Sequence, residues 1–169
     1  RNDLDKLIYA SYVIDLTGEV TNPGQGDNFL FYLLLQTLSH LCYSDLKPKD
    51  ITLVYEIKVM DHLGFRPILD KCISCGKDAK SYFFDVRHGG LICTGCHDRG
   101  GTGYPIQLGS IRTFEYILDM DFNMLNKFKI APSVGKELDI LLGAYIEEQL
   151  GKRLKTRQFI REFDKGGQK

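Results

Sequence analysis

The chain has 169 residues and a formal net charge of zero, with 43% hydrophobic and 26% charged residues. These proportions are typical of a globular protein that has a core of its own. The longest apolar segment, Phe29 to Leu35, has seven residues, whereas a membrane-spanning helix needs about 20. No membrane-spanning helix is therefore expected in this sequence.

The zero net charge hides an uneven distribution along the chain. Residues 1–70 carry 6 Lys/Arg and 10 Asp/Glu, residues 71–100 carry 5 and 3, and residues 101–150 carry 4 and 7. The last segment, residues 151–169, carries 7 Lys/Arg and only 2 Asp/Glu. A basic end on a neutral chain allows a local contact with an anion, without making the whole surface typical of a nucleic-acid-binding protein.

The start of the chain and its cysteines predict a fragment of a cytoplasmic protein. The sequence begins at Arg1, with neither an initiator Met nor the apolar segment of a signal peptide. Five cysteines, an odd number, argue against a fully disulfide-paired secreted protein. Four of them form two tight pairs, which favours a reducing compartment and a bound metal.

Helical spacing of apolar residues predicts a first helix from Leu4 to about Asp15, with Asp3 as a possible cap. A loop rich in Gly follows, from Thr17 to Gly26. Asp27 or Asn28 then caps a second helix with the sequence FLFYLLLQTLSHLCY. This second helix is apolar on most sides, so we expect it to be central in the fold.

A third helix is predicted from Pro48, which suits a first helical turn, to a stop at Gly64. Helical periodicity then disappears over residues 67–105, where Gly becomes frequent. Within this region, two short strands are predicted, Ser81 to Phe84 and Gly90 to Ile92, joined by a turn.

Helical spacing returns after this region. Ser110 is expected to cap one helix, and a short piece from Phe122 to Phe128 follows it. Ser133 is expected to cap a long amphipathic helix. Gly151 ends or weakens that helix, because the apolar spacing continues beyond it.

The predicted fold class is mainly α, with a small four-cysteine zinc finger inserted into a helical domain. The helical domain is expected to comprise residues 1–66 and residues 106–169, the second part ending in the basic segment. The finger is expected at residues 67–105, as a short β-hairpin with two knuckles.

Two C-x-x-C pairs, Cys72/Cys75 and Cys93/Cys96, are separated by 17 residues. A C-x-x-C turn lets two thiolates reach one ion, and Gly76 permits the positive φ that such a knuckle needs. The spacing is that of a zinc site, and four cysteines complete the tetrahedral shell without leaving a position for water. The sequence therefore predicts one structural zinc ion bound by these four cysteines.

Other chemistry has less support in the sequence. A redox C-x-x-C belongs in a βαβ context that is missing, while an iron site with the same spacing stays open as a weaker alternative. His97 directly follows Cys96 but is expected to be a surface residue, and Cys42 is expected to be a buried free thiol. No phosphate-loop, dinucleotide-binding, nucleophile-elbow or zinc-protease motif occurs, so we expect no enzymatic activity.

The basic C-terminal segment has two interpretations of equal weight. Its cations either form a solvated face that suits the negative end of the preceding helix, or they contact phosphates or an acidic peptide. The candidate binding residues are Lys152, Arg153, Lys155, Arg157 and Arg161.

Several segments of the sequence resemble the bacterial recombination mediator RecO. They are DLDKLIYASYVIDL, NFLFYLLLQTLSHL, YEIKVMDHLGFRPILDKCISCG, GGLIC-TGC and LGKRLKTRQFI. The resemblance extends from about Leu4 to Phe163 and is most specific from Tyr55 through Cys75.

This resemblance implies a non-enzymatic protein of DNA repair, located in the bacterial cytoplasm with the nucleoid. Such a mediator acts with RecR and RecF to load RecA onto gaps coated by single-strand-binding protein (SSB), and it anneals complementary strands. The implied partners are RecR, the acidic C-terminal tail of SSB, and single-stranded DNA. The family's N-terminal OB-fold is expected to be absent, which would weaken DNA binding.

Two functions of other classes remain as alternatives. One is a zinc-ribbon module that binds nucleic acid outside DNA repair, which the small positive charge of the finger makes less attractive. The other is an iron electron carrier. A metal analysis separates the latter, because a colourless protein with one zinc per chain eliminates it.

Overall fold

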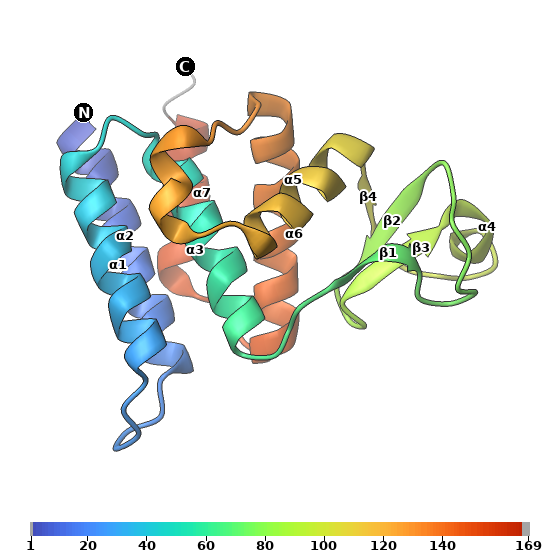
Figure 1. Cartoon of the computed structure of the whole chain (residues 1–169), viewed down its shortest axis with the longest axis horizontal. Helices are drawn as coiled ribbons and strands as arrows, with labels where there is room; N and C mark the ends of the chain where they lie inside the picture. Colours follow the sequence, from blue (N-terminus) through green and yellow to red (C-terminus); the bar gives the residue numbers. More distant parts are fainter. Residues whose placement is uncertain (1, 167–169) are drawn as a thin grey trace. The chain divides into compact units, whose positions relative to one another are not determined.

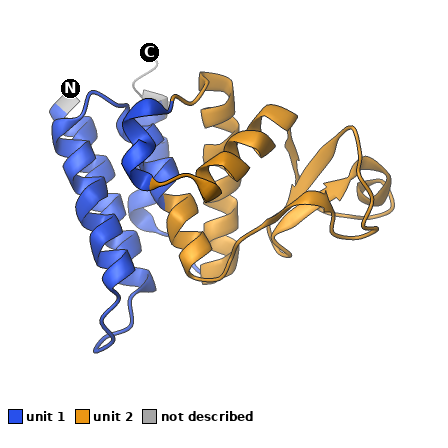
Figure 2. Cartoon of the chain, in the orientation of Figure 1, with its two compact units in different colours: residues 1–55, 122–128, 152–169 blue, residues 56–121, 129–151 orange. Residues whose placement is uncertain are grey.

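The computed structural model describes residues 2–166, with side chains for residues 3–164. Contacts divide the chain into two compact units. Unit 1 comprises residues 1–55, 122–128 and 152–169, and unit 2 comprises residues 56–121 and 129–151 (Figure 2).

The regular elements in the described part of unit 1 are all helices, joined by loops. Its elements are α1 (Asn2–Val20), α2 (Asn28–Tyr43), the first half of α3 (Pro48–His62), the 3-10 helix η1 (Phe122–Lys127) and α7 (Lys155–Gly166). The first two helices form a hairpin and lie side by side (Figure 1). Helical spacing was expected in the regions of α1, α2, α3 and α7, although several boundaries differ from the predicted ones. Residues 122–128 were predicted only as a short piece, with no secondary structure assigned.

The first helix is longer than its periodicity predicted. It continues past Asp15 to Val20, so the expected loop start at Thr17 was wrong. The Thr17 hydroxyl donates to the Val13 carbonyl, 2.6 Å away, which lets a β-branched polar residue stay within the last turns of the helix. Asp3 lies inside the first turn rather than at the cap.

The second and third helices begin where the sequence predicted. The Asp27 side chain accepts a hydrogen bond from the Leu30 N–H at 3.0 Å, so Asp27, not Asn28, is the N-cap of α2. Pro48 occupies the first turn of α3, where its missing N–H costs nothing.

The core of unit 1 combines residues of α1, α2 and α3 with residues of α7. The Tyr9 hydroxyl donates to Asp164, 3.0 Å away, and the Thr156 hydroxyl donates to Asp15, 2.6 Å away. These bonds fix α7 along α1. The largest buried side chains of this unit include Tyr12, Leu16, Leu41, Ile51 and Tyr55.

Unit 2 combines a small sheet with helices. Besides the second half of α3, it contains β1 (Ile68–Cys72), β2 (Tyr82–Asp85), β3 (Gly90–Cys93), α4 (Thr94–His97), β4 (Tyr104–Ile106), α5 (Leu108–Asp119) and α6 (Pro132–Leu150).

The strands form one sheet in the order β1-β3-β2-β4 (Figure 1). β2 and β3 form an antiparallel hairpin in which Phe83 faces Ile92, which confirms the predicted hairpin. β4 pairs antiparallel with β2, and β1 pairs parallel with β3. The two outer strands were not predicted, because β4 has only three residues with Pro105 at its centre and β1 contains the charged pair Asp70-Lys71.

Aromatic side chains fix the sheet against the helices of unit 2. The Phe84 ring lies edge-on to Tyr145 of α6, with 5.3 Å between the ring centroids, and 6.2 Å from Phe114 of α5. The Tyr145 hydroxyl donates to the Phe65 carbonyl at 2.9 Å, and burial raises the pKa of Tyr145 to about 12. The hairpin therefore has an anchor outside the metal-binding region.

The predicted caps of α5 and α6 were wrong. α5 begins at Leu108, two residues before Ser110, and the backbone N–H of Gln107 donates instead to the Glu137 carboxylate at 2.8 Å. α6 begins at Pro132 rather than after Ser133, because Pro suits the first helical position. Gly151 ends α6 in the left-handed conformation, with φ 67°.

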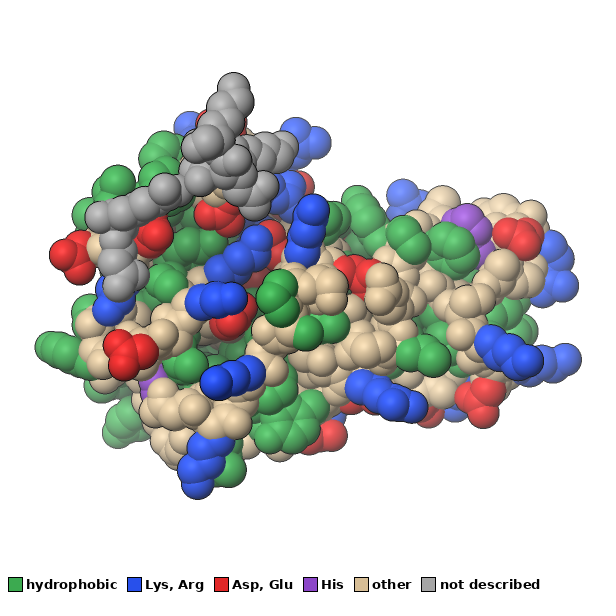
Figure 3. All heavy atoms as spheres, turned by 90° about the horizontal axis from the view of Figure 1, so that it is seen from above, with side chains coloured by type: hydrophobic (Ala, Val, Ile, Leu, Met, Phe, Trp, Pro, Cys, Tyr) green, Lys and Arg blue, Asp and Glu red, His purple; other side chains and the backbone are tan. Residues whose placement is uncertain are grey.

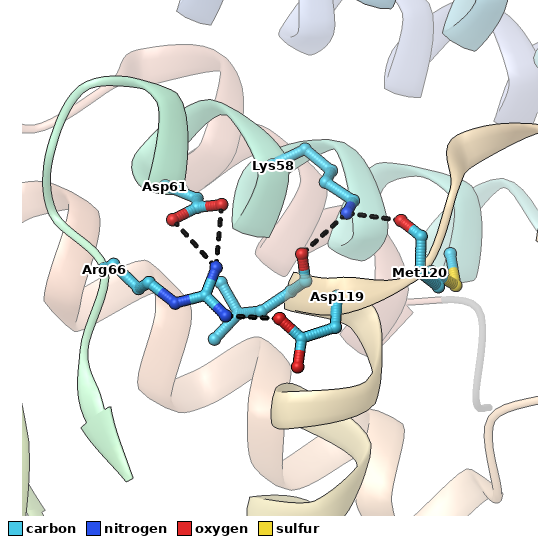
Figure 4. Close-up of polar contacts among 6 residues, drawn as sticks. Lys58, Asp61, Arg66, Asp119 and Met120 are labelled. Atoms are coloured by element: carbon cyan, nitrogen blue, oxygen red, sulfur yellow. Dashed lines mark hydrogen bonds and ion pairs between the residues drawn. The ribbon is translucent and has the colours of Figure 1, made fainter.

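A polar cluster joins α3 to the end of α5 within unit 2 (Figure 4). The Lys58 ammonium donates to the carbonyls of Leu118 and Met120, at 2.9 and 2.6 Å. Burial lowers the pKa of Lys58, but the ammonium still satisfies carbonyls at the negative end of α5. Arg66 bridges Asp61 and Asp119 at the surface.

The proposed boundaries of the finger, residues 67 and 105, stay a prediction. The contacts group the sheet with α5, α6 and the end of α3, rather than setting it apart. Within the described residues, no helix combines the length and apolarity that crossing a membrane requires.

We predict that Gly89→Ala destabilises unit 2 by about 2 kcal/mol or more. Gly89 has φ 64°, and a Cβ there would lie 2.7 Å from the Tyr145 hydroxyl oxygen. The substitution therefore adds backbone strain and displaces the hydroxyl from the Phe65 carbonyl. Urea denaturation would measure the loss.

Gly109→Ala is the matched control, because a Cβ there meets only Val134 at an ordinary 3.8 Å. It should leave the free energy of unfolding unchanged or slightly increased. Equal stability of the Gly89 and Gly109 variants would contradict the close approach of Gly89 to Tyr145.

Candidate metal centre

Four sulfur atoms gather at one end of the sheet. Cys72 ends β1, Cys75 lies in the turn after it, Cys93 ends β3, and Cys96 lies in α4. All four Sγ atoms lie within 4.8 Å of one another. The Cys75 and Cys93 sulfurs are 3.8 Å apart. All four predicted ligands are thus brought together.

The parallel pairing of β1 with β3 explains why the two pairs meet. Parallel strands end at the same edge of a sheet, so Cys72 and Cys93 lie at neighbouring strand ends. The bond from the Ile73 N–H to the Leu91 carbonyl, 2.8 Å, extends this pairing to the start of the first knuckle. A hairpin alone, as predicted, would not have placed Cys72 beside it.

Each knuckle is a tight turn closed by backbone hydrogen bonds. In the first, the Gly76 N–H donates to the Cys72 carbonyl at 2.8 Å, and Gly76 has the predicted positive φ, 71°. In the second, Cys93 occupies the N-cap position of α4, so Cys96 lies in its first turn.

The environment favours thiolates at two of the four positions. Burial acts to raise the pKa of Cys72, but hydrogen bonds from the backbone of Cys93, Cys75 and Ser74 outweigh it and lower that pKa to about 6. The pKa of Cys96 is lowered by a hydrogen bond from the Ser74 side chain and then by Arg99, whose Nη2 lies 3.2 Å from the sulfur. Deprotonated sulfur is the form that binds metal.

The sulfur arrangement fits one tetrahedral metal ion of the zinc type. Four thiolates about 2.3 Å from a central zinc lie roughly 3.8 Å from one another, which matches the separation of Cys75 and Cys93. Four protein ligands leave no position for water or substrate, so such a site is structural rather than catalytic.

His97, His88 and Cys42 lie outside the cluster of four sulfurs. The His97 ring stacks on Phe83, with centroids 3.6 Å apart and planes within 6°, and the His88 ring contacts Asp85 at 2.8 Å. Cys42 was expected to be buried, but it is exposed on α2, so that expectation was wrong.

The basic segment does not form one continuous row of free cations. Lys152 forms an ion pair with Glu19. Arg157 is only 3% exposed, with its guanidinium 5.5 Å from the centre of the Tyr12 ring and Nη1 3.4 Å from the Tyr12 hydroxyl. Arg157 therefore serves the core of unit 1.

The other three basic candidates reach solvent, as Lys152 does. Arg153 and Lys155 are exposed and Arg161 is half-buried, and they belong to two different segments, since α7 begins only at Lys155. Helical spacing indicates the buried position of Arg157, because it lies three residues from both Leu154 and Ile160. Binding of DNA or an acidic peptide by these residues stays a prediction.

We predict that Cys72→Ser lowers the metal content from one zinc per chain to none and unfolds the sheet. Serine is a poor zinc ligand, and three thiolates cannot complete the shell. Metal analysis and near-UV circular dichroism would measure both effects, while α1 and α2 in unit 1 should retain their helical signal.

Cys42→Ser is the matched control for this substitution. It removes an exposed thiol outside the cluster, so zinc content and structure should be unchanged. Zinc retained at full stoichiometry in the Cys72 variant would rule out the four-cysteine centre, and complete loss of helicity would contradict a local role.

The sequence matches a family profile described as "Recombination protein O C terminal" over residues 1–158. A curated relative named "DNA repair protein RecO", from Bacillus mycoides (strain KBAB4), is 30% identical over 165 residues, covering 98% of this chain and 66% of the relative. Another of that name, from Alkaliphilus metalliredigens (strain QYMF), is 33% identical over 147 residues, covering 86% of this chain and 60% of the relative. This chain thus spans less than two thirds of the length of these relatives. The chain belongs to the family of the recombination protein O C-terminal region.

Proposed function

We propose that this chain is part of a bacterial DNA-repair protein and acts as a non-enzymatic recombination mediator. The observation that carries the proposal is the family match over residues 1–158, supported by relatives named for DNA repair. In this role, the protein helps RecA to load onto single-stranded DNA and anneals complementary strands. It works in the bacterial cytoplasm, at the nucleoid.

The metal centre of this protein holds one structural zinc ion. Its ligands are Cys72, Cys75, Cys93 and Cys96. The ion cross-links β1, β3 and α4 through these side chains. The arrangement of the four sulfurs supports this assignment. The zinc thus shapes the surface that carries partner contacts and performs no reaction.

The partners that we propose are RecR, the acidic C-terminal tail of SSB, and single-stranded DNA. Kinship with RecO supports all three. For the two anionic partners, the candidates of the basic segment are the exposed Arg153 and Lys155 and the half-buried Arg161. Lys152 is exposed and paired with Glu19, whereas Arg157 is buried against Tyr12.

The double substitution Lys155→Glu and Arg161→Glu should weaken binding of single-stranded DNA or of an SSB tail peptide at least about tenfold in low salt. If both cations contact phosphates, the slope of the logarithm of the binding constant against the logarithm of the salt concentration should also become shallower, by about 0.7 per lost contact. Fluorescence anisotropy with labelled oligonucleotide or peptide would measure both quantities.

Lys136→Glu is the control for charge, because Lys136 is exposed on α6 in the other unit. It changes the net charge without touching the basic segment, so the affinity should fall little. Unchanged binding of both anionic probes by the double variant would leave the basic segment as solvated surface.

The partner proposal predicts that this chain retains RecR and an SSB tail peptide in pull-down experiments. A chelator should reduce the retention of any partner that binds the surface stabilised by zinc, because loss of zinc unfolds the sheet. The Cys42→Ser variant, treated in the same way, controls for thiol effects. Failure to retain either partner, with zinc bound and the fold intact, would contradict the proposed role for this part of the protein.

A further inference from the structure

The four sulfurs of the candidate metal centre differ in their access to solvent. Cys75 is exposed and Cys93 is partly exposed, whereas Cys72 and Cys96 are buried. Each knuckle therefore has one open and one closed position. We call Cys75 and Cys93 the open pair, and Cys72 and Cys96 the closed pair. The two sulfurs of the open pair belong to different knuckles and lie 3.8 Å apart.

Hydrogen bonds protect the closed pair further. The Cys72 sulfur accepts hydrogen bonds from three backbone N–H groups of the two knuckles. The Cys96 sulfur accepts hydrogen bonds from the Ser74 side chain and from Arg99, whose Nη2 lies 3.2 Å away. A donor at a thiolate withdraws electron density from the sulfur and lowers its nucleophilicity. The closed pair is thus shielded both by burial and by these donors.

The surface around the open pair carries both signs of charge. Next to the first knuckle, the exposed residues include Lys71, Lys77 and Lys80 together with Asp70 and Asp78. Figure 3 shows basic, acidic and apolar side chains side by side at the right-hand end, where the sheet lies in Figure 1. Such a surface neither steers nor repels a small uncharged molecule such as hydrogen peroxide.

We infer that the open pair is a site of oxidative modification, at which hydrogen peroxide joins Cys75 to Cys93 and the metal is released. The inference rests on the zinc assigned above to the four cysteines. Oxidation of cysteine follows thiolate character and exposure, and it is favoured where a second cysteine lies beside the first. Cys75 combines the exposure with a neighbouring sulfur from the other knuckle.

The reaction has two steps. The Cys75 thiolate attacks one oxygen of the peroxide, so that an S–O bond forms, the O–O bond breaks and hydroxide leaves. The Cys93 thiolate then attacks the resulting sulfenic acid, so that the S–S bond forms and a second hydroxide leaves. The two sulfurs together give two electrons to the peroxide, and they approach from 3.8 Å to about 2.05 Å.

The disulfide changes the metal centre but keeps the sheet connected. Two thiolates remain, which is too few for a structural zinc site. The disulfide joins the turn after β1 to the end of β3, so the parallel pairing of these strands stays cross-linked after the metal has left. Because metal binding stabilises the four thiolates, the modification requires an excess of peroxide.

The test uses the zinc-loaded chain with Cys42→Ser, which leaves the four cluster cysteines as its thiols. Excess hydrogen peroxide is added, and a chromogenic chelator measures the released zinc. The remaining thiols are then labelled with N-ethylmaleimide, and tryptic peptides are analysed by mass spectrometry. Trypsin cleaves after Lys77, Lys80 and Arg87, which lie between the knuckles, so a disulfide joins the two cysteine peptides only when it links the knuckles.

We expect one zinc released for each disulfide, with the label on Cys72 and Cys96. Near-UV circular dichroism should retain the signal of the folded sheet after peroxide, whereas a chelator alone should abolish it. Arg99→Ala removes a donor from Cys96 and should raise the oxidised fraction of Cys96 at least about twofold. Arg112→Ala is the matched control, because Arg112 is an exposed cation on α5 and its loss should leave the labelling unchanged.

Two results would overturn the inference while leaving the zinc assignment intact. One is a disulfide within either knuckle, or label that remains on Cys75 and Cys93. The other is zinc retained at peroxide concentrations that fully oxidise the exposed Cys42 of the wild-type chain. An untreated chain that binds no zinc would instead contradict the zinc assignment itself, and the inference with it.

Discussion

The parallel pairing of β1 with β3 is the constraint on which the metal centre depends. Antiparallel hairpins are built by local turns, but a parallel pair needs a connection that returns to the same edge. Here the connection is β2 and its turns, so the strand that brings Cys72 lies beside the strand that ends at Cys93. The sulfurs then meet at one edge, where an ion bound to all four would tie together segments that the short strands alone would hold weakly.

The sheet also depends on support from outside the metal centre. One strand of the hairpin places Phe84 in contact with the rings of Phe114 and Tyr145, so its apolar side rests on α5 and α6. The other anchor is the close approach of Gly89 to Tyr145. Four strands with so few residues could not bury enough apolar surface alone, and the two aromatic contacts compensate for part of that.

The sequence predicted what depends on local spacing and missed what depends on distant partners. The helices, the hairpin, the Asp27 cap and the four-cysteine cluster follow from periodicity, turn residues and ligand spacing. β1 and β4 were missed because their residues lack strand alternation and pair with segments some 20 residues away. Ser110 and Ser133 were wrong as caps, because Gln107 bonds Glu137 and Pro132 begins its helix. The apolar spacing of its neighbours indicates that Arg157 is buried. A count of the charges in the segment treats it as a surface cation instead.

The short span of the four sulfurs has a consequence for how the protein is made. Cys72 to Cys96 occupy 25 consecutive residues, so all four cysteines are synthesised before α5 and α6. Phe114 and Tyr145, which support the sheet, arrive later. Because chains fold from the N-terminus during synthesis, the knuckles can take up their ion on the nascent chain. An ion bound there would keep the thiols from oxidation until the helices pack against the sheet.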